Sequence, residues 1–271
     1  MQVRILTYHM ESLELKNTLS EIGAIVHSIN TIAVSLSLMP NEGVSVPESL
    51  NISWKPSNIE LSKKRARTLA YKSIYVYVAE SLFEYLNSIS KNPLWRHKNI
   101  NFQGQEKKAD RVYSFLTSIP DIDVNIAILV ELLCHWRNRI IHNSSSADLS
   151  HQKKSNLLMV KNDIYALYHH FDTECALNNF KNNIVTLKDV STLSTMVIKC
   201  CRIVDEYFFL GIAKLSNTEI FDLIKGYPEF TKIIKCQKTL KRERQVRRWL
   251  EIHFPYLGPD RIDNIATIAN H

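Results

Sequence analysis

Arg137 and His142 are the two residues of this chain whose types and spacing best suit a chemical reaction. They bracket a six-residue segment that ends a long apolar stretch and leads into a loop of asparagine and serine. An arginine presents a planar, permanently protonated set of donors that fits a phosphate, and a histidine exchanges a proton near neutral pH. A guanidinium and an imidazole at one helix end are sufficient to cleave RNA without a metal ion.

Four arginine–histidine pairs in the chain have a similar spacing, and their surroundings distinguish them. One pair lies at the start of the chain, where order is least assured. Two others share His253 in a strongly basic segment, where almost any downstream histidine matches. Because only Arg137 follows an apolar helical stripe and precedes a helix-ending loop, we take its pair with His142 as the candidate site.

The chemistry of RNA cleavage by its own 2′-hydroxyl assigns a role to each candidate residue. His142 can be the base that takes the hydroxyl proton or the acid that protonates the 5′-oxygen. The Arg137 guanidinium can stabilise the negative charge that accumulates on the phosphorus oxygens. Asn138 can orient the phosphate or the imidazole. Residues five apart on a straight helix point about 140° from each other, so Arg137 and His142 converge only if the helix ends between them.

Structural roles for the same region stay open. Arg137 can satisfy carbonyls at a helix C-terminus, and His142 can be a C-cap donor. The neighbouring His135 and Trp136 fit packing better than catalysis. Glu80 can either brace Arg137 as a carboxylate partner or be an ordinary surface charge.

The composition favours an all-α fold. Six glycines in 271 residues are few, since average usage predicts about 19, and scarce glycine leaves few tight hairpins. A hydrophobic content of 45% is enough to bury a sizeable core. The net charge of +7 and the pI near 9.1 suit a polyanionic partner such as RNA, although a solvated basic surface has the same composition.

Apolar periodicity predicts helices throughout the chain, with Ser62, Asp123 and Thr186 as N-caps. We expect three units: an N-terminal arm over 1–60, a helical bundle over 61–212 and a basic helical region over 213–271. The predicted helices of the bundle cover about residues 62–90, 109–118, 123 to the motif, 155–171 and 186–210.

The N-terminal arm contains an uncharged run from Ile22 to Asn41 that is long enough to span a bilayer. Its histidine, asparagine and hydroxyl side chains make insertion costly, so we expect a buried amphipathic helix and no membrane partner. The first residues lead into no apolar signal segment. Five cysteines without a CxxC spacing indicate reduced thiols in the cytoplasm. His169 and His170 have no further ligand at metal-binding spacing, so we expect no metal and no cofactor.

The basic region carries an amphipathic segment that can follow an RNA backbone, with Trp249 or Tyr256 stacking on a base. Packing on the bundle with the charges in water is the alternative. The predicted RNA-binding residues are Lys238, Lys241, Arg242, Arg244, Arg247 and Arg248.

The arrangement of long helices around Arg137, Asn138 and His142 resembles the HEPN superfamily. The signature of that family is an arginine, four to six residues and a histidine, commonly with a polar residue directly after the arginine. The resemblance covers about residues 61–212. It implies a helical bundle whose two motifs meet at one cleft of a C2 homodimer, in an RNase that acts on tRNA or mRNA in toxin–antitoxin, anti-phage or CRISPR-linked systems. Members regulated by nucleotidylation have a tyrosine two residues after the histidine, and Ser144 stands there in this chain.

The sequence therefore predicts a metal-independent endoribonuclease of a defence or toxin system, restrained by an antitoxin or another regulatory partner. Two alternatives stay open. One is a catalytically inactive HEPN-like bundle that binds RNA or nucleotide, or that scaffolds a defence complex. The other is an unrelated helical interaction protein.

Overall fold

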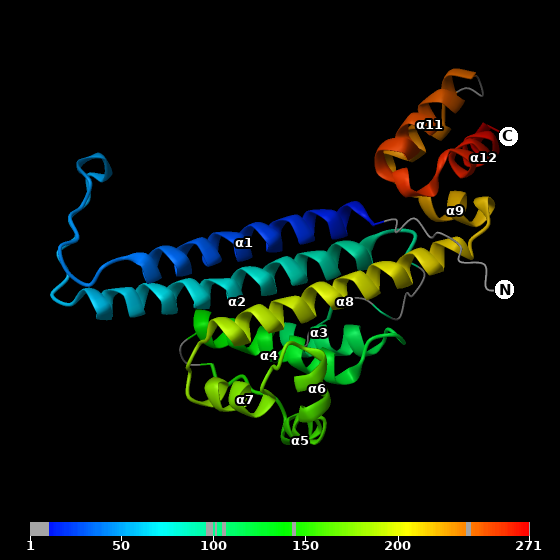
Figure 1. Ribbon diagram of the computed structural model, residues 1–271. Coiled ribbons are helices and arrows are strands. Elements are labelled where there is room, and N and C mark those ends of the chain that lie inside the picture. The colour runs from blue at the N-terminus through cyan, green and yellow to red at the C-terminus, as the bar shows by residue number, and fades with distance from the viewer. Residues whose placement is uncertain are drawn as a thin grey trace, which may run out of the picture.

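The computed structural model describes residues 11–95, 100, 102–104, 107–142, 145–236 and 240–270. Within these residues the chain forms twelve α-helices and two short 3-10 helices and has no strand, which confirms the predicted all-α fold. Three long helices lie side by side: α1 (Leu13–Leu38), α2 (Ile59–Lys91) and α8 (Leu187–Ala213) (Figure 1). The core helix α4 (Val124–Ile141) packs against α2, α8 and α3 (Lys108–Thr117).

Polar residues set the starts of these helices. The predicted caps Asp123 and Thr186 are confirmed, because each side chain accepts a hydrogen bond from the first turn of its helix. The prediction that Ser62 caps α2 is wrong. Asn58 accepts from the main-chain N–H of Leu61 and starts the helix one turn earlier.

The segment predicted as one helix over 155–171 is two helices, α5 (His151–Met159) and α6 (Lys161–Leu167), separated at Val160. A helix α7 (Thr173–Lys181) follows, which the sequence did not predict. His169 and His170 both have positive φ, so the chain turns sharply after α6. Apolar spacing alone did not show this break, because Leu157 and Ile164 are buried on both sides of it.

The predicted N-terminal arm is mostly the helix α1, which packs along α2 and α8. Among the described helices, α1 is long and apolar enough to cross a membrane, by length and composition alone. The mean hydropathy of its most apolar 18 residues is 1.3. The expectation of a buried helix is correct for one face only. The buried residues of α1 are Leu15, Thr18, Ile22 and Ile29.

The start of α1 is tied to α8 by a buried carboxylate. Asp205 accepts the main-chain N–H of Ser12 at 2.9 Å and also the Ser12 hydroxyl, and the Tyr85 hydroxyl of α2 lies 3.4 Å from the same carboxylate. Burial raises the pKa of Asp205 to about 6, although the hydrogen bonds from Ser12 act in the opposite direction. Three helices therefore share one polar contact inside the core.

The chain ends in a small helical unit beyond α8: α9 (Asn217–Ile224), α10 (Pro228–Ile234), α11 (Leu240–His253) and α12 (Pro259–Asn270). Phe230, Trp249 and Phe254 form its aromatic centre. The Arg261 guanidinium joins it to the end of α8 by donating to the carbonyls of Ile212 and Leu215. The predicted boundary between residues 212 and 213 thus falls at the end of α8.

We predict that Asp205 makes the stability of the protein depend on pH. Between about pH 4 and pH 6 the folded state holds more protons at Asp205 than the unfolded state, so this contribution to the unfolding free energy falls as pH rises. The amide of Asp205→Asn does not titrate. Between pH 4 and pH 7, the unfolding free energy of the variant will therefore rise relative to that of wild type by up to about 3 kcal/mol, as measured by urea denaturation.

The matched control is Asp121→Asn at an exposed position of the turn before α4. Its stability relative to wild type is expected to stay constant over the same pH range. Parallel pH profiles for wild type and Asp205→Asn would show that Asp205 titrates normally in the folded protein.

Candidate functional site

The helix that carries the motif is held by the core up to its last turn. Every residue of α4 from Ile126 to Trp136 is buried. Trp136 stacks on Tyr75 of α2 at 5.0 Å between ring centroids and meets the ring of Phe180 edge-on at 5.1 Å. Both His135 and Trp136 are buried, and the ring contacts of Trp136 confirm its predicted packing role. These contacts fix the rotation of α4, and with it the direction of Arg137.

Arg137 is braced from α2 by Glu80. The Glu80 Oε1 atom lies 2.7 Å from Nε and 2.5 Å from Nη2 of the guanidinium, whose side chain is 15% exposed. Nη1 donates to Oδ1 of Asn138 at 3.2 Å. The interpretation of Glu80 as a partner of Arg137 is therefore confirmed. Within the described residues the hydrogen bonds of Arg137 go to side chains, so it does not cap the carbonyls of α4.

His142 follows the last residue of α4 and is exposed. Its main-chain N–H donates to the carbonyl of Asn138 at 2.9 Å, so His142 occupies the C-cap position of α4. Because α4 continues to Ile141, no break between Arg137 and His142 brings the two side chains together. Within the described part of the chain, no hydrogen bond joins the His142 imidazole to Arg137 or Asn138. Ser144 lies outside the described residues.

Arg139 holds the loop after the motif and was given no role by the sequence. Its guanidinium lies 3.6 Å from the centroid of the Phe180 ring and donates to the carbonyls of Phe180 at 2.8 Å and Ala147 at 3.0 Å. The second arginine of the motif therefore joins α4 to α7. The sequence carried no signal for this contact, since Phe180 lies on a helix that was not predicted.

A hollow of about 550 Å³ opens beside Glu80. Lys108 approaches the second carboxylate oxygen of Glu80 at 3.6 Å and lies over the Phe83 ring, and Arg111 lies over the Phe102 ring. Both rings are buried under these cations, and the carboxylates of Glu80 and Glu84 also line the hollow, so it presents charged groups of both signs. The sequence did not reveal this hollow because its walls come from α2, α3 and the loop at 102–104.

The predicted RNA-binding residues of α11 separate into three groups. Lys241, Arg244 and Arg248 are exposed. Arg247 pairs with Asp263 at 2.9 Å, so part of its charge is neutralised. The prediction for Arg242 is wrong, because it is buried and donates to the carbonyl of Ala269. Lys238 lies outside the described residues.

The predicted base-stacking residues are also mostly enclosed. Trp249 is buried against Phe230 and Phe254, so it is not available to stack on a base. Tyr256 is partly buried, and its ring meets Phe208 and Phe209 edge-on at the end of α8. Both aromatic residues therefore belong to the packing of the C-terminal unit.

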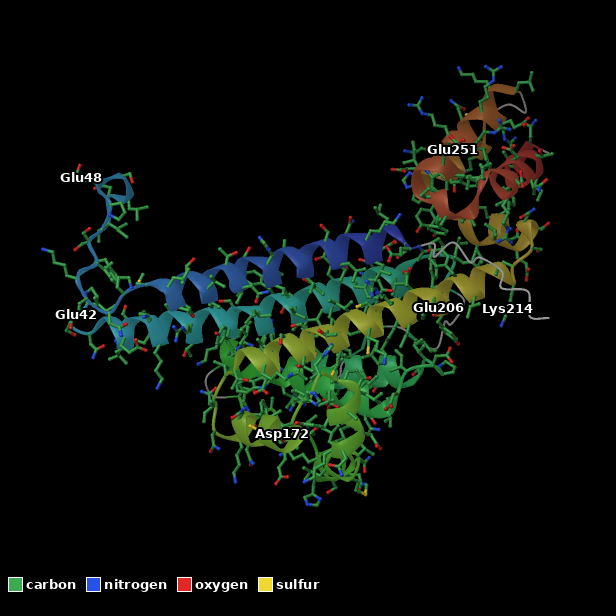
Figure 2. All side chains as sticks on the ribbon, in the orientation of Figure 1. Glu42, Glu48, Asp172, Glu206, Lys214 and Glu251 are labelled. Atoms are coloured by element: carbon green, nitrogen blue, oxygen red, sulfur yellow. The ribbon has the colours of Figure 1, made fainter. Side chains whose placement is uncertain are left out.

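The motif and the basic helix lie at opposite ends of α8. Arg139 joins the motif to α7, and Asn179 of α7 donates to Asp189 in the first turn of α8 at 2.8 Å. Arg261 joins the C-terminal unit to the last turn. A helix of 27 residues is about 40 Å long, so one chain does not place both surfaces in one cleft. Figure 2 shows the same separation between Asp172, which caps α7, and Glu251 of α11.

No family model, no curated protein and no solved structure matches this chain.

Proposed function

We propose that this chain is a metal-independent endoribonuclease of the HEPN type, which serves a toxin–antitoxin or anti-phage defence system in the cytoplasm. The observation that carries the proposal is the fixed guanidinium of Arg137. Glu80 and Asn138 orient it at the end of a buried helix, and His142 is exposed one turn further on. A guanidinium already oriented for a phosphate costs little reorganisation when RNA binds.

The hydrogen bonds of Arg137 leave donors for a substrate. A guanidinium carries five N–H groups, of which the contacts with Glu80 and Asn138 engage three. The remaining N–H groups are sufficient to bind a phosphate oxygen while negative charge develops on it. His142 takes the proton of the 2′-hydroxyl or donates one to the 5′-oxygen. The products are a 2′,3′-cyclic phosphate and a 5′-hydroxyl end.

A homodimer supplies the second imidazole that this chemistry needs. Arg137 is covered by α2 and does not itself require a second chain. The requirement comes from His142, whose imidazole is exposed and has no partner in proton transfer among the described residues. A two-fold axis near the end of α4 would bring two His142 side chains to one RNA phosphate. An antitoxin or regulatory protein that covers His142 would then silence both copies.

A second candidate function is a catalytically inactive HEPN-like protein that binds RNA or nucleotide, or that scaffolds a defence complex. The hollow beside Glu80 favours it, because the cations Lys108 and Arg111 line it and His142 does not. The two candidates differ in one measurable property, since only the first breaks the RNA chain.

We predict that wild-type protein cleaves RNA in the presence of EDTA, and that Arg137→Ala and His142→Ala each slow cleavage at least about 100-fold. Sequencing of the RNA ends and gel assays will measure this. Circular dichroism and thermal unfolding will show that both variants stay folded. Arg65→Ala and His151→Ala remove the same side chains at exposed positions of α2 and α5 and are the matched controls.

Two outcomes would redirect the proposal. Cleavage by His142→Ala at the wild-type rate would show that the site is assigned wrongly. Binding of RNA by wild-type protein without any cleavage would support the second candidate function.

The dimer is expected to have a solution mass of about twice 31.4 kDa. Under conditions in which subunits exchange, mixing Arg137→Ala with His142→Ala protein places one intact motif residue of each kind in a mixed dimer. A composite site that needs one copy of each residue regains activity in this mixture, and a site that needs all four stays inactive. An active enzyme with the mass of a single chain would exclude the shared site.

We predict that α11 contributes to RNA affinity through its exposed cations. In the His142→Ala background, replacing Lys241, Arg244 and Arg248 by glutamine should lower the slope of log affinity against log salt by about 2. Filter binding at several salt concentrations measures the slope. A triple replacement of the exposed Lys16, Lys64 and Arg65 by glutamine makes the same charge change on α1 and α2. Equal slopes for the two triple variants would show that α11 has no specific role.

A further inference from the structure

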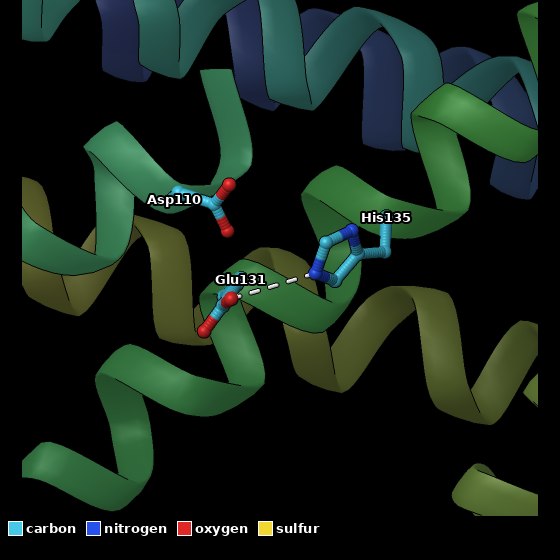
Figure 3. Close-up of side chains that lie close together, drawn as sticks. All are labelled: Asp110, Glu131 and His135. Atoms are coloured by element: carbon cyan, nitrogen blue, oxygen red, sulfur yellow. Dashed lines mark ion pairs between the residues drawn. The ribbon is translucent and has the colours of Figure 1, made fainter. Parts of the chain in front are cut away.

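Three potential metal ligands from two helices converge inside the bundle, on another side of α4 than Arg137. Asp110 comes from α3, and Glu131 and His135 lie one turn apart on α4 (Figure 3). One ligand atom of each lies within 4.8 Å of the others. Glu131 and His135 are buried and Asp110 is partly exposed.

The His135 imidazole is the group that indicates a missing ligand. Its side chain is 5% exposed, and neither ring nitrogen has a hydrogen-bond partner. Nε2 points at Oε1 of Glu131 across 3.4 Å, too far for a normal hydrogen bond. That separation equals the edge of a tetrahedron around a zinc ion with bonds of about 2.1 Å. A buried imidazole without a partner is unfavourable unless an ion or another group binds it.

Lys153 is the internal cation of this region, and it leaves one oxygen of Glu131 available. Its Nζ lies 2.6 Å from Oε2 of Glu131 and over the Tyr113 ring. The other oxygen, Oε1, faces His135. A metal ion can therefore bind Oε1 while Lys153 keeps Oε2. The positive charge of Lys153 would weaken the binding of a second cation, but it does not block the position.

We propose that Asp110, Glu131 and His135 bind one divalent transition-metal cation, for which Zn²⁺ is the best probe. Two carboxylates and one imidazole suit a first-row ion, whereas Mg²⁺ and Ca²⁺ prefer oxygen ligands alone. Three protein ligands leave a fourth position for water, which the partly exposed side at Asp110 can admit. The ion would join α3 to α4 two residues before the motif.

The metal site is independent of the proposed RNase activity. Residues 135 and 137 point about 160° apart around α4, so the ion would not reach a phosphate held by Arg137. Binding of the ion and cleavage of RNA are thus separate measurements.

The test uses the full chain after treatment with a chelator. Titration with Zn²⁺ against a chromophoric chelator is expected to give one ion per chain, and Co²⁺ is expected to show visible d–d absorption. His135→Gln should lower the affinity about 100-fold or more, and His151→Gln, at an exposed position, should not change it. Lys153→Met should raise the affinity at least about tenfold, because it removes a competing charge.

Three results would overturn the proposal. They are the absence of Zn²⁺ binding in wild type, affinity that His135→Gln does not change, and loss of binding in a His169→Gln, His170→Gln variant, which would locate the ion at surface histidines. If His135→Gln fails to fold, Asp110→Asn and Lys153→Met carry the test, since both change residues with solvent access. The former must weaken binding and the latter must strengthen it.

Discussion

The burial of α4 is the constraint on which the rest of the structure depends. Eleven successive residues, from Ile126 to Trp136, are removed from water by α2, α3, α5 and α8, so the helix cannot rotate or slide without exposing apolar surface. The stacking of Trp136 on Tyr75 and its edge-on contact with Phe180 fix its last buried turn. Every polar group on α4 therefore has a fixed direction, and its neighbours must complement it there.

Charged groups at the border of this core are arranged in pairs between helices. Glu80 meets Arg137, Lys153 meets Glu131, and Asp205 meets the N-cap of α1. A buried charge without a partner is far more costly than a paired one, so each contact also specifies which helices are neighbours. His135 differs from these groups because its ring nitrogens have no hydrogen-bond partner, and this difference carries the proposal of a metal site.

If the chain binds RNA as we propose, the separation of the motif from the basic helix limits how the RNA is placed. The two surfaces serve one RNA only if it is long enough to extend along much of α8, which has 27 residues, or if a second chain brings its own α11 near the motif. The hollow beside Glu80 is nearer to Arg137 and is lined by the cations Lys108 and Arg111. The RNase that we propose would therefore place a nucleotide next to the cleaved bond in this hollow, with α11 as a distant electrostatic contact.

The sequence by itself determined the helical class, the caps at Asp123 and Thr186, and the position of the motif at the end of α4, because these follow from glycine content, local hydrogen bonding and apolar periodicity. It did not determine the break at Val160 or the burial of Arg242 and Trp249, since the same periodicity fits an exposed helix and a packed one. Only the tertiary structure decided that Glu80 holds Arg137 and that Asp110 reaches His135. Those partners are far apart in sequence, and their contacts arise from the way the helices pack.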